Sequence, residues 1–381
     1  MNLRVFEAFA GIGTQRMALK RAGIPHEVVA ISEIDRHAIK AYTAIHGDTT
    51  NMGDIREITS GDVPDHDLFT YSFPCQDISI AGKKRGFTAG SGTRSSLLWE
   101  CERIISDKRP KYLLLENVKA LVNRHNRPGF EEWLAVLEGY GYTNYWKVLN
   151  AKNYGVPQNR ERVFCVSIHG EHKPFEFPEP VPLTVRAIDL LEDEVDERYY
   201  LSEKIARRFT LTPRLETEIK IYGHVKTRLD TSGYRYLVYD PRGIMTCLTG
   251  TEAKFPKLLA IGASRGRDPA DPSDRTPGMP TVQRIEINRD GVSNTLSTVQ
   301  KDNLVVESAD RIRIRHITPR EAWRLMGISD QDYDKASTVA SKTQLYKMAG
   351  NAIVVPVLEA LFTQMLTDTA MEQNQQKDDT K

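Results

Sequence analysis

Short β-rich runs alternate with segments of helical periodicity between residue 3 and about residue 170. The β-rich runs read "LRVFEAF", "EVVAIS", "LFTYSF", "KYLLLE" and "RVFCVSI", and helices are expected from Thr14, from Arg36, near 97–106 and near 130–137. Strands that alternate with helices are typical of a parallel sheet with helices on both faces. The first part of the chain is therefore predicted to be a doubly wound α/β domain.

The composition of the chain changes after Gly170. "EHKPFEFPEPVPLTVR" is rich in proline and glutamate and indicates a linker, with a domain boundary near 175. From 180 to 310, turn signals and β-prone runs such as "YRYLVY", "RIEINR" and "NLVVE" predict a smaller strand-rich domain. This region contains a weak internal repeat, "GIMTCLT" from Gly243 and "GVSNTLS" from Gly291.

The helical pattern returns at about residue 311. In "TPREAWRLMGI", Thr318 is expected to be the N-cap, with Pro319 at the first helical position and Glu321 near the capping-box position. "GNAIVVPVLEALFTQML" is expected to be a buried helix, and the polar tail from Met371 is expected to be disordered. The predicted units are a first domain over 1–175, a strand-rich domain over 176–310, a segment over 311–370 that returns to the first domain, and a tail over 371–381.

The composition is that of a soluble globular protein, with 40% hydrophobic and 27% charged residues among 381. No apolar run approaches the length needed to span a bilayer, and "MNLRVFEAFAG" lacks the pattern of a signal peptide, so a cytoplasmic location is expected. The net charge of +1 leaves the kind of partner open.

The cysteines lie far apart and form no C-x-x-C or Cys/His cluster, which argues against a zinc site and a disulfide framework. No metal is expected. Cys101 and Cys165 fit the role of small buried apolar residues, whereas Cys75 fits that role less well. Cys247 is the fourth cysteine.

A glycine turn follows the first β-rich run. "FAGIG" places Gly11 and Gly13 between a strand and a helix, where a ligand can approach backbone amides closely, although a tight turn alone explains them about as well. About 20 residues further on, Glu33 ends the second run, where an acid can accept hydrogen bonds from ribose hydroxyls. "GDI" offers Asp54 and Ile55 at a further strand end, suited to an adenine. A helix cap and a turn residue are the simpler readings of the two acids, but three suitable strand ends in order favour an adenosyl ligand.

Cys75 follows Pro74 at the end of "LFTYSF", so the sheet should position it at the edge where ligands bind in such folds. A long polar stretch comes next, from about Gln76 to Ser95, and it carries Lys83, Lys84, Arg85 and Arg94. A loop of this length is usually a functional lid or disordered. Basic residues near a thiol lower its pKa and attract phosphate, although a solvated turn would also explain them.

An acid and two arginines follow in the later strands. "KYLLLENV" brings Glu116 and Asn117 to the same edge, where burial would raise the pKa of the Glu116 carboxyl and let it donate a proton. In "QNRERVF", Arg160 and Arg162 alternate at the start of a strand and should face the same way. A helix cap or surface acid and an edge-strand charge pair are the simpler readings.

Taken together, these motifs resemble those of the DNA (cytosine-5) methyltransferases of bacterial and phage restriction-modification systems. The matching stretches span Phe9 to Val354 and are, in order, "FAGIG", "SEID", "GDI", "FPCQDIS", "LLWE", "ENV", "QNRER", "GVSNTLS", "TPREAWRLMG" and "GNAIV". The resemblance implies a doubly wound S-adenosylmethionine-dependent methyltransferase fold, Rossmann-like with a mixed sheet, and a smaller target-recognition domain.

The resemblance also implies the chemistry. Cys75 would add to C6 of a cytosine flipped out of double-stranded DNA, and C5 would then accept a methyl group from S-adenosylmethionine. Glu116 would act at N3, Arg162 would hold O2, and Arg160 would support the pocket. The residues implied for DNA binding are Gln76, Ser79, Lys83, Arg94 and Thr295. Those implied for the cofactor are Phe9, Gly11, Gly13, Glu33, Ile34, Asp54, Ile55, Leu97, Asn351 and Ala352.

The chain departs from the family pattern at three places. Ile34 stands where many members have a tryptophan, "FPCQ" replaces the commoner "PPCQ", and Cys247 takes the threonine position in one copy of the repeat, so the structural role is assigned to Thr295 and Leu296. Target recognition is expected from about 180–289, where "GASRGRDPADPSDRTPG", with Arg265 and Arg267, could enter a groove or be a solvated loop.

Three other functions compete with this interpretation of the motifs. An RNA-directed cytosine-5 transferase would share the chemistry, but the Thr-Cys and Cys-Phe-Thr motifs of such relatives do not occur here. A silent DNA-binding regulator would not need Cys75, Glu116 and the arginine pair together. A Rossmann dehydrogenase would need a third glycine. The resemblance further implies a prokaryotic or phage-encoded monomer, with or without a companion restriction endonuclease.

Overall fold

The computed structural model describes residues 2–74, 97–200, 202, 210–211, 258–267, 282–287, 293–294, 303–308 and 312–378. For the strands from Thr210 to Ile314, and beyond Leu366, it describes the backbone alone. Cys75, Gln76, Ser79, Lys83, Arg94, Cys247 and Thr295 lie outside the described residues, so the predictions made for them stay predictions.

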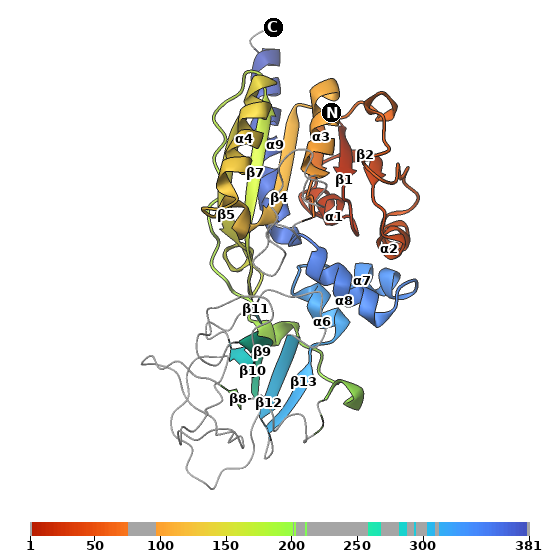
Figure 1. Cartoon of the computed structure of the whole chain (residues 1–381), viewed down its shortest axis with the longest axis vertical. Coiled ribbons are helices and arrows are strands. Elements are labelled where there is room, and N and C mark those ends of the chain that lie inside the picture. Colours follow the sequence, from red (N-terminus) through yellow and green to blue (C-terminus); the bar gives the residue numbers. More distant parts are fainter. Residues whose placement is uncertain are drawn as a thin grey trace.

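A six-stranded mixed sheet forms the centre of the larger part of the molecule (Figure 1), with the order β2-β1-β3-β4-β7-β5. Its strands are β1 (Leu3–Ala8), β2 (His26–Ser32), β3 (Leu68–Tyr71), β4 (Tyr112–Val118), β5 (Tyr142–Asn150) and β7 (Glu161–His169). The first four run parallel, whereas β7 runs antiparallel to both β4 and β5. The expectation of a parallel sheet is therefore wrong for β7, whereas β5 again runs in the direction of the first four strands, and the mixed sheet implied by the resemblance is confirmed.

Helices cover both faces of this sheet, as a doubly wound fold requires. Side chains from α1 (Thr14–Arg21), α2 (Arg36–His46) and the C-terminal helices share one apolar cluster with Val5, Leu68 and Leu114. Side chains from α3 (Leu98–Lys108) and α4 (Arg127–Gly139) share the other with Phe6, Phe69 and Leu113. Adjacent residues of one strand thus belong to opposite cores, as the period of two demands.

The C-terminal segment folds back onto the first domain through α6 (Pro319–Arg324), α7 (Asp330–Ser337), α8 (Lys342–Asn351) and α9 (Val355–Asp378). The capping box is confirmed, because the Thr318 amide donates to Glu321 Oε2 at 2.7 Å and the Glu321 amide donates to Thr318 Oγ1 at 3.2 Å. The buried helix expected from "GNAIVVPVLEALFTQML" is interrupted at 352–354, since Pro356 has no backbone N–H to continue a helix and fits only the first turn of the next one. The Val355 amide donates instead to the Met326 carbonyl oxygen at 3.0 Å.

Helix α9 continues to Asp378, so the tail is helical up to that residue and not disordered as expected. Glu, Gln, Met and Lys are good helix formers, and extending an existing helix requires no new nucleation. By length and composition, the stretch Lys342–Leu366 could cross a membrane, but 56% of its apolar window is buried inside the protein. Leu358, Leu361 and Phe362 of α9 belong to the same core as Leu19 of α1, which is typical of a core helix.

A second sheet of five strands lies at the other end of the molecule (Figure 1), in the order β13-β12-β9-β10-β8. Its strands are β8 (Thr210–Leu211), β9 (Leu258–Arg267), β10 (Val282–Ile287), β12 (Asn303–Ser308) and β13 (Ile312–His316). The runs "RIEINR" and "NLVVE" correspond to β10 and β12. Arg265 and Arg267 lie in strand β9, paired with β10, so this part of the expected solvated loop is sheet.

Candidate active site

The glycine turn after β1 has a left-handed backbone at three positions. Phe9, Gly11 and Gly13 have φ angles of 55°, 58° and 75°. A non-glycine residue in this region marks a locally constrained backbone, which is common at functional sites. The Gly11 amide donates to Glu33 Oε2 at 2.8 Å, so the ends of β1 and β2 are joined. The glycine turn and Glu33 therefore lie side by side at one edge of the sheet.

Glu33 is held from several sides. Its Oε1 accepts hydrogen bonds from the amides of Ile34 and Asp35, each at 2.8 Å. The Asn51 side chain accepts from the Glu33 amide at 3.1 Å and donates to its carbonyl oxygen at 3.0 Å. The side chain of Ile34 is 69% exposed at the same corner of the sheet. The carboxylate therefore has a fixed position beside the glycine turn.

Asp54 and Ile55 do not follow a strand as predicted. Before them the chain forms a single isolated β-bridge, between Ile31 and Asn51. The Ser32 Oγ atom donates a hydrogen bond to the Gly53 carbonyl oxygen at 2.7 Å, which holds this segment beside the end of β2. A loop thus reaches the sheet edge without joining the ladder.

The two residues differ in their surroundings. The hydrogen bond from Arg56 Nε at 3.0 Å lowers the pKa of the Asp54 carboxyl. Ile55 is buried, and Phe9 and Leu97 pack against the same apolar cluster. This corner therefore has an apolar wall and a carboxylate beside it.

The returning C-terminal segment reaches the same region. Asn351 is the exposed last residue of α8, and Ala352 is buried. Arg160, itself buried, donates from Nη2 to the Ala352 carbonyl oxygen at 2.9 Å and to the Gly350 carbonyl oxygen at 3.1 Å. Arg160 thus ties the sequence "GNA" to the start of β7.

Glu116 and Arg162 form an ion pair at the sheet edge. Because β7 is antiparallel to β4, Val118 pairs with Arg162, and the first residues of β7 lie beside the last residues of β4. Arg162 Nε lies 3.2 Å from Glu116 Oε1, and both side chains are largely buried. Burial raises the pKa of the Glu116 carboxyl, against the opposing effects of Arg162, Arg160 and Ser72. The acid and both arginines meet as predicted, although the arginines come from the amino end of an antiparallel strand.

The segment that leads to Cys75 ends beside this pair. Phe73 is buried, and its carbonyl oxygen accepts a hydrogen bond from Asn117 Nδ2 at 3.0 Å. Asn117 was not among the predicted site residues, and its only signal was its place next to Glu116. Gln158 is a second such residue, since it is fully buried and donates from Nε2 to the Leu325 carbonyl oxygen at 2.6 Å.

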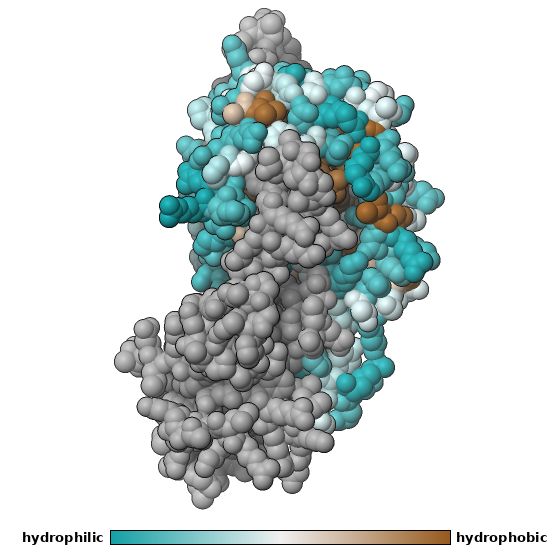
Figure 2. All heavy atoms as spheres, in the orientation of Figure 1, coloured by the Kyte–Doolittle hydropathy of each residue, from teal (hydrophilic) through white to brown (hydrophobic). Residues whose placement is uncertain are grey.

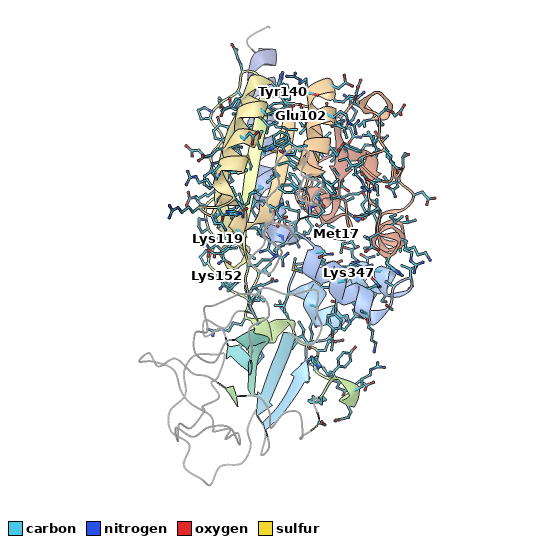
Figure 3. All side chains as sticks on the ribbon, viewed as in Figure 1. Met17, Glu102, Lys119, Tyr140, Lys152 and Lys347 are labelled. Carbon is cyan, nitrogen blue, oxygen red and sulfur yellow. The ribbon has the colours of Figure 1, made fainter. Side chains whose placement is uncertain are left out.

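Lysine side chains lie along this end of the six-stranded sheet, toward the second sheet. Figure 3 shows Lys119 and Lys152 there, and Lys347 beside α2. Lys119 Nζ lies 2.9 Å from Glu161 Oε2, and Lys347 Nζ lies 2.6 Å from Asp35 Oδ2. The edge that carries Glu116 and Arg162 is therefore flanked by lysines, and Lys119 and Lys347 are paired with carboxylates there.

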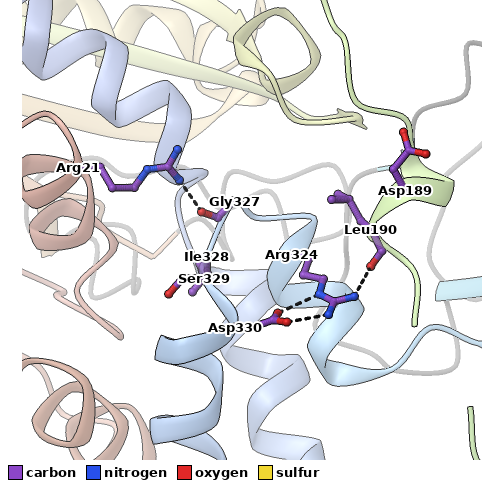
Figure 4. A pocket seen from close by; sticks show the side chains of 8 residues that line it. All are labelled: Arg21, Asp189, Leu190, Arg324, Gly327, Ile328, Ser329 and Asp330. Atoms are coloured by element: carbon purple, nitrogen blue, oxygen red, sulfur yellow. Dashed lines mark hydrogen bonds and ion pairs between the residues drawn. The ribbon is translucent and has the colours of Figure 1, made fainter. Parts of the chain in front are cut away.

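A separate hollow of about 440 Å³ lies between α1 and the α6–α7 turn (Figure 4). Arg324 fills part of it with contacts to Asp330 at 2.7 Å and to the Leu190 carbonyl oxygen at 3.1 Å, while Arg21 donates to the Gly327 carbonyl oxygen at 2.9 Å. Its arginines are therefore engaged in holding the junction together. Among the described residues, no group of three or more His, Cys, Asp or Glu is arranged to hold a metal ion.

Comparison with known proteins agrees with this geometry. The family model for C-5 cytosine-specific DNA methylases matches residues 3–367. The type II methyltransferase M2.ScrFI of Lactococcus lactis subsp. cremoris is 38% identical, over 95% of this chain and 99% of the relative. The orphan methyltransferase M.SPBetaI of Bacillus phage SPbeta is 30% identical, over 96% of this chain and 98% of the relative.

A solved structure shows the same fold at low sequence identity. The crystal structure of a DNMT2 mutant from Spodoptera frugiperda superposes with a TM-score of 0.65 at 15% identity, and the match covers 96% of this chain and 100% of that one. The expected methyltransferase fold is confirmed. The chain belongs to the C-5 cytosine-specific DNA methylases and is a DNA (cytosine-5) methyltransferase.

Proposed function

We propose that the protein transfers a methyl group from S-adenosylmethionine to C5 of a cytosine flipped out of a specific double-stranded DNA sequence, through a covalent bond between Cys75 and C6. One observation carries the proposal. The buried pair of Glu116 and Arg162 lies at the sheet edge beside Phe73, whose carbonyl oxygen is held by Asn117 two residues before Cys75. The described segment thus ends one residue before the proposed nucleophile, beside the acid and the cation.

The roles of the side chains follow from the charges that develop on the ring. As the Cys75 thiolate adds to C6, negative charge moves toward N3 and O2. A protonated Glu116 donates to N3, which suits a carboxyl whose pKa is raised by burial. Arg162 is a hydrogen-bond donor for O2, and Arg160 keeps the edge rigid through the Gly350 and Ala352 carbonyl oxygens.

The final steps restore the aromatic ring. Once C5 carries the new methyl group, the C5 hydrogen leaves as a proton, the electrons of that bond form the C5–C6 double bond, and the thiolate departs from C6. No oxidant or reductant is needed. Flipping is required because the ring edge and C6 face are inaccessible inside a duplex.

The residues of the glycine turn fit an adenosyl cofactor. S-adenosylmethionine supplies an electrophilic methyl group when it is bound. Gly11 has open space where a side chain would stand, so a ligand can approach its backbone. We assign Glu33 to the ribose, and Asp54, Ile55 and the exposed Ile34 to the adenine. The remaining residues proposed to line the site are Phe9, Gly13, Leu97, Asn351 and Ala352.

We propose that DNA binds along this lysine-flanked edge. Lys119 and Lys152, which Figure 3 labels, would then face the phosphates of the DNA. Residues Gln76, Ser79, Lys83 and Arg94 belong to the proposed lid, and Thr295 to the turn that supports the target-recognition domain over 176–310. The catalytic domain is proposed to span 1–175, with 311–370 returning to it and 371–381 as the tail.

The biological setting is also a proposal. Relatives named as type II methyltransferases and as orphan methyltransferases occur in bacteria and phages. We propose a cytoplasmic monomer of prokaryotic or phage origin that acts on DNA, either beside a restriction endonuclease for the same site or alone.

The experiment is transfer of labelled methyl groups from S-adenosylmethionine to DNA by the purified protein. Cys75→Ala should abolish transfer, whereas Cys101→Ala, which changes a buried thiol inside α3, should retain it. Full activity of Cys75→Ala would overturn the mechanism, and transfer to tRNA but not to DNA would overturn the proposed substrate. Mapping of 5-methylcytosine in DNA from cells that express the protein would give the recognition sequence.

A further inference from the structure

A buried carboxyl lies directly beneath the glycine turn and has no part in the proposed chemistry. Glu7 is on β1 and is 0% exposed. The Tyr42 hydroxyl donates to its Oε2 at 2.9 Å, while Oε1 has no hydrogen-bond partner among the described residues. Burial raises the pKa of the Glu7 carboxyl to about 7, against the opposing effects of the Tyr42 hydrogen bond and the charge of Arg16. A group that is costly to bury implies a local function.

Helix α1 lacks a cap of its own. Its N-cap residue is Gly13, which has no side chain to accept the first amides, and the first turn contains no acidic residue. The amides at a helix N-terminus need acceptors, and a carboxyl group there is favourable. The charge of Arg16, a residue of that first turn, lowers the pKa of the Glu7 carboxyl. The Glu7 carboxyl therefore lies close to the uncapped start of α1.

Two side chains of α2 contact the turn from the other side. A Cβ atom on Gly13 would lie 2.5 Å from His46 Nε2 and 2.6 Å from Tyr42 Cε2, so both rings touch the Gly13 backbone. His46 Nε2 donates to the Ile12 carbonyl oxygen at 3.0 Å, and the two rings lie 4.6 Å apart. Tyr42 thus contacts the turn and bonds to Glu7 at once.

We propose that Glu7, acting through Tyr42 and the first turn of α1, is a positioning residue that fixes the glycine turn in its cofactor-binding conformation. This inference rests on the proposed function, in which Gly11 and Gly13 receive S-adenosylmethionine. Glu7 itself is sealed from solvent and is assigned no contact with cofactor or DNA in the proposed function. Its loss should weaken cofactor binding and leave the rate of the saturated enzyme unchanged.

The test measures binding of S-adenosylhomocysteine by calorimetry at pH 8, together with kcat at saturating S-adenosylmethionine and DNA. Glu7→Gln removes the charge, and Tyr42→Phe removes one hydroxyl. Each should raise the dissociation constant by about tenfold, the effect of losing one hydrogen bond to a charged group. Each should change kcat by less than about twofold. Tyr142→Phe is the matched control, because its buried hydroxyl donates to the Pro110 carbonyl oxygen at 2.8 Å, away from the turn.

The outcomes separate the two proposals. Unchanged affinity in folded Tyr42→Phe, or an equal loss in Tyr142→Phe, would overturn the positioning role. A fall in kcat at unchanged affinity would also overturn it and would make Glu7 part of the chemistry. If Glu7→Gln does not fold, Tyr42→Phe decides alone. If the unaltered protein binds no S-adenosylhomocysteine, the proposed function fails and this inference fails with it.

Discussion

Gly11 and Gly13 share one turn and one backbone conformation, but substitution by alanine should affect them very differently. Both have a positive φ, 58° and 75°. A Cβ atom on Gly11 would meet nothing within 4 Å, whereas one on Gly13 would overlap Tyr42 and His46 at 2.6 and 2.5 Å. The Tyr42 side chain is fully buried and cannot move aside into solvent. Gly13→Ala should therefore destabilise the protein more than Gly11→Ala.

The magnitudes follow from the two separate costs. The left-handed conformation costs a non-glycine residue about 1–2 kcal/mol, and both variants pay it. Overpacking against a filled site adds about 1–3 kcal/mol in Gly13→Ala alone. Both variants also lower the entropy of the unfolded chain to the same extent, so this effect cancels in the comparison. The difference in the free energy of unfolding between the variants should therefore be about 1–3 kcal/mol.

Urea unfolding of both variants measures this difference, with the m-value as a check that the denatured state is unchanged. The second measurement is calorimetry of S-adenosylhomocysteine binding. Gly11→Ala should bind this ligand more weakly, because its new methyl group fills the space that the cofactor approaches, although this variant is the more stable of the two. Equal stabilities of the two variants would refute the packing argument. Unchanged affinity of Gly11→Ala would refute the placement of the cofactor.

Three further changes test other buried groups. Because the pKa of Glu7 is about 7 in the folded protein against 4.5 ordinarily, the folded state keeps a proton that the unfolded state releases. The free energy of unfolding should therefore fall by up to about 3 kcal/mol as pH rises from 4.5 to 7, and Glu7→Gln should remove this slope in urea titrations. Glu321→Gln removes the charge that lies 2.9 Å from the buried Arg315 guanidinium and should cost about 3–5 kcal/mol of unfolding free energy. Glu359→Gln, in a half-exposed pair with Arg21, should cost less than about 1 kcal/mol. Arg160→Lys cannot reproduce both carbonyl contacts and should cost about 1–3 kcal/mol in thermal unfolding.

The elements that local chemistry specifies could be predicted from the sequence. The cap of α6 by Thr318 and Glu321 depends on residues three apart, and the start of α2 at Arg36 depends on Asp35, which accepts from the His37 amide at 2.9 Å. The buried strand β4 carries a continuous apolar run from Tyr112 to Leu115. Such signals lie within a few residues of the structure that they specify.

The elements that depend on tertiary contacts could not be predicted. Strand β5 is an edge strand whose residues alternate irregularly between buried and exposed, so it has no clean period of two. The loop with Asp54 reaches the sheet edge through Ser32, a contact between residues 21 apart in the chain. The partners of Arg160 lie 190 and 192 residues away. No local pattern encodes contacts of this range.

The candidate site shows the same division. The residue types at the sheet edge were predictable because each motif lies at the end or the start of a strand. The ion pair of Glu116 with Arg162 was not predictable, since it depends on the direction of β7. Glu7 was overlooked for a related reason. In "LRVFEAF" it reads as one polar residue in a β-rich run, and only the packing of α2 shows that its carboxyl is sealed beneath the turn.

The reversal of β7 is what makes one edge of the sheet sufficient for the chemistry. In a wholly parallel sheet, ligands collect at the carboxyl ends of the strands, so only the last residue of each strand and the loop after it can reach them. An antiparallel strand beside β4 contributes its first residues to that edge, which is why Arg162 faces Val118. If β7 were parallel to β4, its first residues, Arg162 among them, would lie beside the first residues of β4. They would then be about 20 Å from the site edge, at about 3.3 Å per residue. The ion pair with Glu116 would then be impossible, and the arginine for the base would have to come from a loop. The antiparallel strand instead places it on the rigid sheet, where a site residue is held most firmly.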